Sequence, residues 1–245
     1  LTKHFGGIRA IEEVRFRVME GSITSIIGPN GAGKTTLFNC LTGITQPTKG
    51  RVSFLDTEIT GFRPSSIVKL GIARTFQNIR LFKEMSVLEN IMVSQHCRTG
   101  AGLFASILRG NAFKKEEKII EEKALEYLEL VGLEDFAETL SWNLPYGSQK
   151  RLEIARAIAT EPRLMLLDEP TAGMNPQETS EMMELIKKLQ ELGKTIILIE
   201  HDMKVVMGIS ENIVVLDHGV RIAEGTPGEI RKNPLVIEAY LGKEH

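Results

Sequence analysis

The sequence has few cysteines, no excess of basic residues and no long hydrophobic run. Its two cysteines, Cys40 and Cys97, cannot form a disulfide framework in a chain of 245 residues, and no Cys/His cluster accompanies them. We therefore expect a reducing compartment, the cytosol. Lys and Arg number 30 against 32 Asp and Glu, and no five consecutive residues carry charges of one sign. A nucleic-acid partner is therefore not expected.

The longest apolar runs, around Met165–Leu167 and Ile196–Ile199, have the length of a β-strand rather than the ~20 residues of a membrane-spanning helix. The chain is therefore not expected to cross a bilayer by itself. A hydrophobic content of 42% excludes disorder as the main state and suffices for one core with an added lobe. Because the first residue is Leu1 rather than Met, we also expect a short start segment to precede it.

Apolar segments of strand length alternate with helix-period segments near both ends of the chain, which predicts an α/β fold with a parallel sheet. The segments expected as strands are Ile23–Ile27, Arg51–Leu55, Ile72–Phe76, Leu164–Leu167, Thr195–Ile199 and Ile213–Leu216. The turn Asp217-His218-Gly219 is expected to belong to a hairpin. Between Ser86 and Leu140 the alternation stops, and the periodicity predicts a helical lobe.

A glycine-rich segment follows the first expected strand and opens a helical segment. Its residues are Gly28, Pro29, Asn30, Gly31, Ala32, Gly33, Lys34 and Thr35, with Thr36 next, and they match the phosphate-binding pattern G-x-x-x-x-G-K-[ST]. The glycines let backbone N–H groups point at an anion, and the helix adds the positive end of its dipole. We expect Lys34 to contact the terminal phosphates of a nucleotide and Thr35 to bind Mg²⁺. The alternative is a turn that merely joins strand to helix.

The expected strand Leu164–Leu167 is followed by two carboxylates, Asp168 and Glu169. A carboxylate at the end of a buried strand needs a cation or hydrogen-bond donors. We expect Asp168 to hold Mg²⁺, directly or through water, and Glu169 to polarise the water that attacks the γ-phosphate. The alternative for Asp168 is a cap of the following turn.

His201 follows another expected strand, Thr195–Ile199. Ligands of open parallel sheets bind at the carboxyl ends of the strands, so Lys34, Asp168 and His201 are expected to converge. We expect His201 to contact the γ-phosphate. The alternative is an ordinary histidine at a helix start or on the surface.

The order of these segments, with Gln77 after a strand and Leu144-Pro145-Tyr146-Gly147-Ser148 after the helical lobe, resembles the ATP-binding subunit of an ABC transporter. The resemblance covers nearly the whole chain. It implies a P-loop NTPase core, residues 1–77 and 161–245, with a parallel sheet and an antiparallel β portion, and an inserted helical lobe, residues 78–160. It also implies Mg²⁺-dependent ATP hydrolysis by two copies, or two related ATPase chains, arranged head to tail.

The resemblance assigns roles to further residues. Each ATP is held between the phosphate loop of one chain and the signature segment of the other, which includes Gly147 and Ser148. Gln77 corresponds to the glutamine that senses Mg²⁺ and the lobe. Phe5 falls where an aromatic ring stacks on adenine, although a Phe in a core staple would fit equally.

Two segments depart from the family pattern. Pro145, Tyr146 and Ser148 replace Ser, Gly and Gln of the usual signature L-S-G-G-Q, which removes a hydroxyl but leaves backbone N–H groups where we expect a helix, residues 149–160. Asn175 replaces the aspartate of the D-loop. With Pro176 and Glu178 it predicts a capped helix start, which explains Asn175 by a structural role.

Within the family, the segments Arg74–Phe82, Met85–Val93 and Ile199–Met203 resemble the larger ATPase subunit of branched-chain amino-acid importers. This implies integral-membrane permease subunits as partners, indirectly a solute-binding protein, and a peripheral location at the cytoplasmic face of the inner membrane. ATPases of urea or lipopolysaccharide-export systems remain alternatives. An ABC-type ATPase that acts on DNA or the ribosome is a more distant one.

The segment from Gln77 to His96 carries more apolar side chains than one helix face needs for its own core. They are Ile79, Leu81, Phe82, Met85, Val87, Leu88, Ile91 and Met92. We expect some of them to line a groove that receives a short permease helix. The alternative is that all are buried within the lobe.

Overall fold

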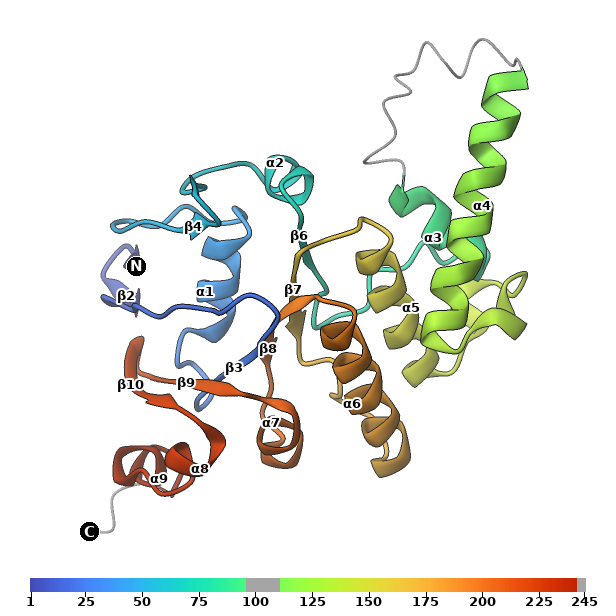
Figure 1. Ribbon diagram of the computed structural model, residues 1–245. Coiled ribbons are helices and arrows are strands. Elements are labelled where there is room, and N and C mark those ends of the chain that lie inside the picture. Colours follow the sequence, from blue (N-terminus) through green and yellow to red (C-terminus); the bar gives the residue numbers. More distant parts are fainter. Residues whose placement is uncertain (96–110, 242–245) are drawn as a thin grey trace. The chain divides into compact units, whose positions relative to one another are not determined.

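The structure of the chain, a computed structural model, describes residues 1–95 and 111–241, without the side chains of residues 111–115 and 241 (Figure 1). Its contacts divide the chain into two compact units. Unit 1 comprises residues 1–74 and 163–245, and unit 2 comprises residues 75–162. Cys97 and His96 lie outside the described residues. Within the described ranges, no helix is both long enough and apolar enough to span a membrane.

Unit 1 is built on a six-stranded sheet with the strand order β10-β9-β3-β8-β7-β6. Its strands are β3 (Ile23–Ile27), β6 (Ile72–Arg74), β7 (Leu164–Asp168), β8 (Thr195–Ile199), β9 (Asn212–Asp217) and β10 (Val220–Gly225). All neighbours pair in parallel except β9 and β10. Every residue of β3 and β8 is buried, which explains the continuous apolar run Ile196–Ile199 of β8. β3 also buries two polar residues, Thr24 and Ser25.

Two short antiparallel pairs belong to the same unit. β1 (Lys3–Phe5) pairs with β2 (Ile8–Ile11), and β4 (Ser53–Phe54) pairs with β5 (Thr57–Glu58). The sequence pattern missed β1 and β2 because only Ile11 among their residues is buried. The strand expected over residues 51–55 is reduced to β4, and the strand expected over residues 72–76 ends two residues earlier. The expected hairpin is confirmed, since β9 and β10 meet around residues 217–220.

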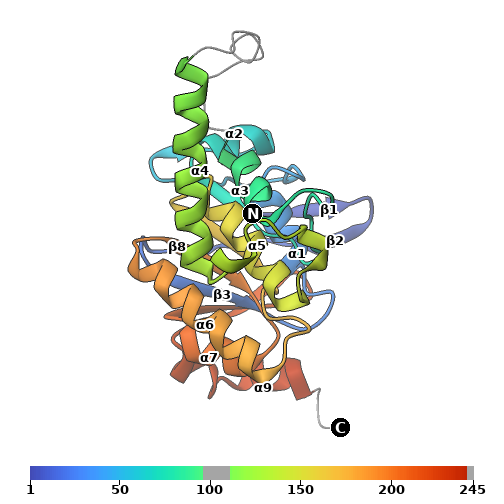
Figure 2. The same ribbon diagram turned by 90° about the vertical axis from the view of Figure 1, so that its right-hand side faces the viewer.

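Helices cover both faces of the large sheet (Figure 1). On one face, α1 (Lys34–Leu41) and α2 (Pro64–Lys69) share a hydrophobic cluster that includes Phe38 and Ile26. On the other face, α7 (Met203–Ile209) buries Val206 in a cluster with Ile27. Ile26 and Ile27 are neighbours on β3 and serve opposite clusters, as the alternation of a strand requires. α6 (Pro176–Glu191) lies beside α7 in both Figure 1 and Figure 2.

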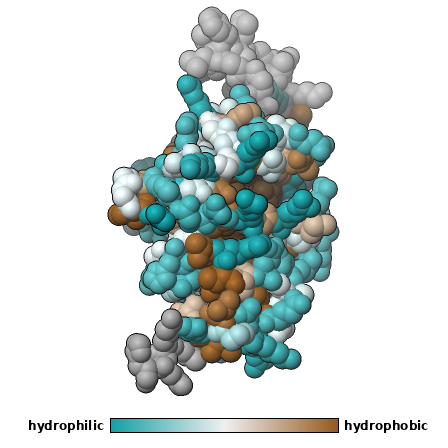
Figure 3. Space-filling model, turned by 90° about the vertical axis from the view of Figure 1, so that its left-hand side faces the viewer, coloured by the Kyte–Doolittle hydropathy of each residue, from teal (hydrophilic) through white to brown (hydrophobic). Residues whose placement is uncertain are grey.

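Two short helices, α8 (Pro227–Ile230) and α9 (Pro234–Leu241), complete the second cluster with Ile230 and Val236. Leu235 and Ile237 of α9 remain exposed. Figure 3 shows apolar side chains gathered in the lower half of one face, surrounded by hydrophilic ones. Because Val236 is buried while Leu235 and Ile237 are exposed, α9 carries apolar side chains on more than one side.

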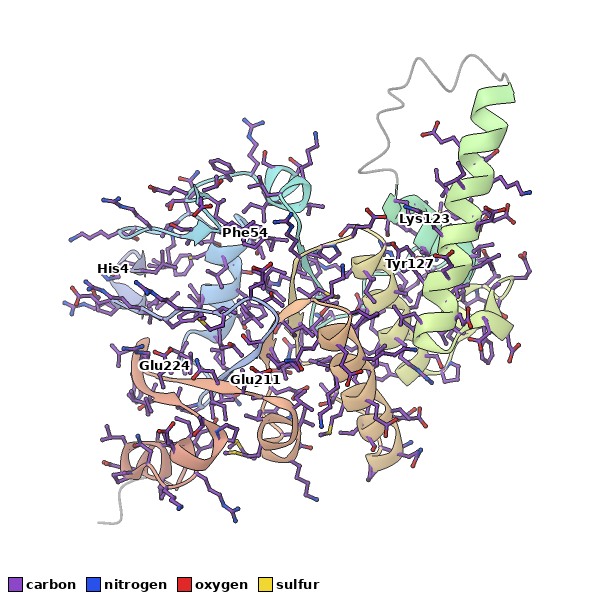
Figure 4. The ribbon with its side chains drawn as sticks, viewed as in Figure 1. His4, Phe54, Lys123, Tyr127, Glu211 and Glu224 are labelled. Atoms are coloured by element: carbon purple, nitrogen blue, oxygen red, sulfur yellow. The ribbon has the colours of Figure 1, made fainter. Side chains whose placement is uncertain are left out.

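Unit 2 is helical where the sequence periodicity predicted helices. α3 (Val87–Gln95), α4 (Asn111–Val131) and α5 (Tyr146–Ile158) pack together, with single 3₁₀ turns at Glu134–Phe136 and Ser141–Asn143. α4 buries Ile120, Ala124 and Leu128, spaced four residues apart. On its polar side, Lys123 donates a hydrogen bond of 2.9 Å to Glu161 and ties α4 to the end of the unit (Figure 4).

Candidate functional site

The glycine-rich loop joins β3 to α1 within unit 1. Gly28, Gly31 and Gly33 have positive φ angles of 150°, 82° and 97°. A Cβ atom on Gly28 would lie 2.0 Å from the carbonyl oxygen of Leu216, and one on Gly33 would lie 2.4 Å from that of Ala10. Both positions therefore exclude any side chain, and the loop backbone is held closely against β9 and β2.

The loop leads directly into α1, whose first residue is Lys34. In the described part of the chain, no side chain caps this helix, so its first N–H groups and its dipole favour an anion. Lys34 Nζ donates hydrogen bonds to the carbonyl oxygens of Gly28 at 2.6 Å and Pro29 at 3.0 Å. Burial lowers the pKa of Lys34, and the charges of Glu169 and Asp168 act in the opposite direction. Lys34 therefore lies within electrostatic reach of both carboxylates.

Asp168 ends β7 and is nearly fully buried. Its Oδ2 accepts a hydrogen bond of 2.8 Å from Nη2 of Arg74, which ends the neighbouring strand β6. Nη1 of Arg74 donates to Asn39 Oδ1 at 2.7 Å and to Thr42 Oγ1 at 3.2 Å, at the far end of α1. Arg74 thus links the carboxylate at the end of β7 to the helix that follows the phosphate loop.

Glu169 has a left-handed backbone conformation, with a φ angle of 50°, which costs free energy in a residue with a Cβ atom. Its N–H donates to the carbonyl oxygen of Ile199 at 2.9 Å, so it is anchored to the end of β8. Its Oε2 lies 3.9 Å from Nδ1 of His201, whose side chain is 65% exposed. The two side chains therefore face the same solvent-accessible space.

The strand order explains why residues distant in sequence meet here. β3, β8, β7 and β6 are consecutive neighbours in the sheet and parallel, so their carboxyl ends lie along one edge. The structure brings Lys34, Asp168 and His201 to this edge, as the strand pattern predicted, and Glu169 lies there as well. Gln77 belongs to unit 2, where it is exposed three residues after the end of β6.

The signature segment lies at the start of α5 in unit 2. The helix begins at Tyr146, not at Gln149 as expected, because Pro145 ends the preceding extended segment and is the N-cap residue. Its first-turn N–H groups therefore belong to Tyr146, Gly147 and Ser148, while Gln149 already donates to the Pro145 carbonyl at 2.9 Å. Within the described residues, no side chain caps this helix either. Gly147 and Ser148 are both buried.

Charged side chains of α5 hold the segment that follows Gln77. Lys150 Nζ donates to the Gln77 carbonyl oxygen at 2.7 Å, and Glu153 Oε1 accepts from the Arg80 N–H at 2.7 Å. Arg156 donates to the Arg80 carbonyl oxygen. Burial raises the pKa of Glu153, opposed by its hydrogen bond to Arg80 and by nearby positive charges. The helix that carries the signature thus fixes the backbone path of residues 77–80.

The apolar residues expected between positions 77 and 95 differ in burial. Phe82 is 44% exposed, and Met85 and Met92 are half-buried. Val87, Leu88 and Ile91 are buried within unit 2. Ile79 and Leu81 instead line a groove of about 420 Å³, whose other lining residues are Lys83, Glu84, Ser141, Trp142 and Gln149. The expectation that only part of this set forms the lobe core is therefore confirmed. The groove combines apolar side chains with a polar rim.

Two other candidates have clear local environments. Phe5 is 48% exposed on β1, with Lys3 Nζ at 4.7 Å from its ring centre, so the core-staple alternative is wrong. Asn175 caps α6, and the Glu178 carboxylate accepts a hydrogen bond of 2.9 Å from the Asn175 N–H. The predicted capping box is confirmed.

The sequence interpretation missed Arg74 and Glu200. Arg74 ends an apolar strand, and Glu200, fully buried, directly follows another. The same signal that singled out Asp168, a charge at the end of an apolar run, was available for both. A cavity of about 900 Å³ elsewhere in unit 1 is lined by residues such as Phe16, Val52 and Leu164. This cavity does not include the phosphate loop, so cavity volume alone would not have located the candidate site.

The described residues contain no cluster of three or more His, Cys, Asp or Glu side chains that could hold a metal ion. A metal at this edge would have Asp168 as its carboxylate and the Thr35 hydroxyl as a further oxygen. These are hard oxygen ligands, which suit Mg²⁺ when phosphate oxygens complete its shell.

Comparison with known proteins identifies the class. A family model described as ABC transporter matches residues 11–172, and a second, described as branched-chain amino acid ATP-binding cassette transporter, matches residues 220–245. The chain belongs to the ABC transporter family, as an ATP-binding protein and an ATPase.

Individual relatives are similar over almost their whole length. The high-affinity branched-chain amino acid transport ATP-binding protein BraF of Pseudomonas aeruginosa is 50% identical over 244 residues, covering 99% of this chain and 96% of BraF. The ADP conformation of the ATP-binding cassette MJ1267 is 35% identical with a TM-score of 0.86, covering 99% and 96% of the two chains. The ADP- and phosphate-bound dimer of the cassette MJ0796 is 29% identical with a TM-score of 0.77, covering 92% and 95%.

Proposed function

We propose that this chain is the ATPase subunit that powers import of branched-chain amino acids. The observation that carries the ATPase part is the placement of Lys34, Asp168, Glu169 and His201 at one edge of the sheet. The solute assignment rests on the names of the similar proteins, BraF among them, and on the family model that matches residues 220–245.

Unit 1 supplies the groups that fit ATP and Mg²⁺. Residues 28–36 offer a loop whose closely held glycine backbone leaves N–H groups for the phosphates, and Lys34 adds a positive charge. Thr35 and the buried Asp168 would supply oxygen ligands to Mg²⁺. The metal contact expected of Gln77 stays a prediction. Bound Mg²⁺ neutralises charge on the phosphates. Phe5, exposed on β1, offers a ring for adenine.

Glu169 and His201 act at the γ-phosphate. The Glu169 carboxylate accepts a proton from the attacking water, and its anchored backbone keeps that oxygen in a fixed place. His201 donates to a phosphate oxygen from its exposed ring. Both side chains come from loops that follow neighbouring strands, β7 and β8, which supports their action on the same phosphate group.

The second nucleotide contact comes from another chain. We infer that α5 of a second copy, or of a related ATPase, offers the N–H groups of Tyr146, Gly147 and Ser148 to the γ-phosphate. The uncapped start of this helix supports that role. The MJ0796 cassette, similar to this chain, forms a dimer.

The groove lined by Ile79, Leu81 and Trp142 fits a short helix of an integral-membrane permease. Such docking places the chain at the cytoplasmic face of the inner membrane, peripherally, with a solute-binding protein acting indirectly. Because α5 holds residues 77–80, a permease that moves this segment also acts on the helix of the signature.

Hydrolysis assays with two variants test the catalytic assignment. Lys34→Ala removes a direct phosphate contact and should weaken both ATP binding and turnover. Glu169→Gln keeps the shape but loses the base, so turnover should fall about 10²- to 10⁴-fold while ATP still binds. Lys187→Ala, an exposed lysine on α6, is the control. Equal loss of nucleotide affinity in both site variants would contradict these roles.

Sedimentation tests the dimer. Glu169→Gln with MgATP should form a dimer and ADP should leave monomers, because the γ-phosphate joins the two chains. If the sample still sediments as monomers with MgATP when this chain and a related ATPase chain are both present, the head-to-tail dimer is wrong.

A reconstituted complex tests the groove. Leu81→Gln should leave basal ATP hydrolysis intact and abolish its stimulation by solute, because a polar side chain weakens an apolar contact with the permease. Leu125→Gln, at an exposed apolar position on α4 outside the groove, is the matched control. Normal stimulation of the folded Leu81→Gln variant would place the docking surface elsewhere.

A further inference from the structure

Glu200 is a carboxylate with no solvent exposure, directly before His201. A buried carboxylate is stable only where donors replace the water that it has lost. Glu200 has three such donors, and all three belong to the two loops that follow β7 and β8.

The donors come from Thr171 and His201. Oε1 of Glu200 accepts from the Thr171 N–H at 3.0 Å and from the Thr171 hydroxyl at 2.6 Å. Oε2 accepts from the His201 N–H at 3.2 Å. These three hydrogen bonds join the two loops through one buried side chain, where no water competes for them.

Thr171 belongs to the turn that begins with Glu169. The Ala172 N–H donates to the Glu169 carbonyl at 3.3 Å, and the Met174 N–H donates to the Thr171 carbonyl at 3.1 Å. Glu169 itself has the left-handed conformation, which persists only where the surroundings hold it. Its N–H is held by Ile199 on one side, and the turn is held through Thr171 by Glu200 on the other.

We propose that Glu200 is a positioning residue that sets the distance between the Glu169 carboxylate and the His201 ring, which is 3.9 Å in this structure. The proposal rests on the proposed function, in which Glu169 and His201 act on one phosphate. Glu200 reaches no substrate itself, because it is fully buried. It acts through Thr171 and through the backbone of His201.

Thr171→Val tests this contact because it removes the hydroxyl and keeps the side-chain shape. A displacement of about 1 Å in reacting groups costs on the order of 10²-fold, so kcat should fall about 10- to 100-fold, with the ATP affinity and KM within about twofold of the original. Thr171→Ser, which keeps the hydroxyl, should restore most of kcat. Glu200→Gln should likewise lower kcat and leave KM within about twofold of the original. Thr160→Val, which loses a hydroxyl bond to the Ala157 carbonyl, is the matched control.

Rates are compared at a temperature well below each melting temperature. A Thr171→Val variant with unchanged kcat, a parallel loss of kcat and affinity, or failure of Thr171→Ser to restore kcat would each overturn the proposal. Glu169→Gln in the same assay separates the two hypotheses. If Glu169→Gln turns over normally, the catalytic assignment of Glu169 is wrong. If it is inactive while Thr171→Val is normal, only the positioning role is wrong.

Discussion

The buried carboxylates of unit 1, Asp168 and Glu200, differ from the buried carboxylate of unit 2, Glu153, in how completely their oxygens are paired. In unit 1, Asp168 pairs with Arg74, and both oxygens of Glu200 have donors. In unit 2, Glu153 has one backbone donor for Oε1, and its Oε2 has no hydrogen-bond partner within the described residues. The sheet brings the unit 1 partners together from different strands, whereas one helix supplies the charged side chains in unit 2.

This difference matches two tasks. Complete pairing in a low-dielectric interior favours one arrangement, which suits the neighbouring side chains that we propose contact a phosphate group. Incomplete pairing leaves part of the burial cost in place, as the raised pKa of Glu153 indicates. One buried oxygen of the side chain that accepts from the Arg80 N–H thus has no hydrogen bond within the described residues to offset its burial.

The largest effect is expected from breaking a completed pair. Arg74→Gln leaves Asp168 buried without its cation, which costs about 3 to 5 kcal/mol. At about 2 to 4 °C per kcal/mol, the melting temperature should fall by about 6 to 20 °C. Lys118→Gln, in the exposed pair with Glu122, is the control and should change stability by less than about 1 kcal/mol. Equal effects of both changes would remove the contrast with surface charges.

A smaller effect is expected in unit 2. Glu153→Ala removes the acceptor of the Arg80 N–H, and it also removes a carboxylate oxygen that has no hydrogen-bond partner among residues 1–95 and 111–241. We expect a loss of about 1 to 3 kcal/mol, measured by denaturant unfolding. Glu129→Ala, an exposed acid on α4, is the matched control. A loss as large as that of Arg74→Gln would mean that the lobe charges are as tightly coupled as those of the core.

A helix cap provides a reference within unit 1 that involves neither charge network. Asn175→Ala should cost about 1 kcal/mol, because two backbone N–H groups of α6 lose their acceptor. Asn175→Asp retains the acceptor and should be close to neutral. If the alanine variant has the melting temperature of the original chain, the cap contributes nothing to stability and cannot serve as the reference.

The smallest effect is expected from pH. The folded-state pKa of Glu153 lies above its ordinary value of 4.5, so the folded chain binds this proton more tightly than the unfolded chain does. Stability from this group is therefore present at low pH and is lost as pH rises from 4.5 through the folded pKa. The difference in melting temperature, Glu153→Gln minus the original chain, should therefore increase as the pH rises from 4.5 through the folded-state pKa. A difference independent of pH would show that Glu153 does not titrate as described.

Local patterns predicted much of the core. The phosphate loop, the paired acids after β7 and the Asn175 cap each depend on a few consecutive residues. Partner choice could not be predicted in this way, because Arg74 and Asp168 meet only when β6 lies beside β7. The start of α5 was placed three residues late because Pro145, as N-cap, allows helical conformation from the next residue. β1 and β2 were missed because strands with little burial carry little apolar signal.

The hydrogen bonds from α5 to the segment after Gln77 involve the Gln77 carbonyl and the Arg80 carbonyl and N–H, all of which are main-chain atoms. Any amino acid except proline at position 80 supplies the same atoms. Ile79 and Leu81, which line the groove, can therefore change over evolution or by engineering without altering the course of the chain. If the groove binds a permease as proposed, a few replacements at these surface positions would be enough to change the partner, and the path of residues 77–80 would stay the same.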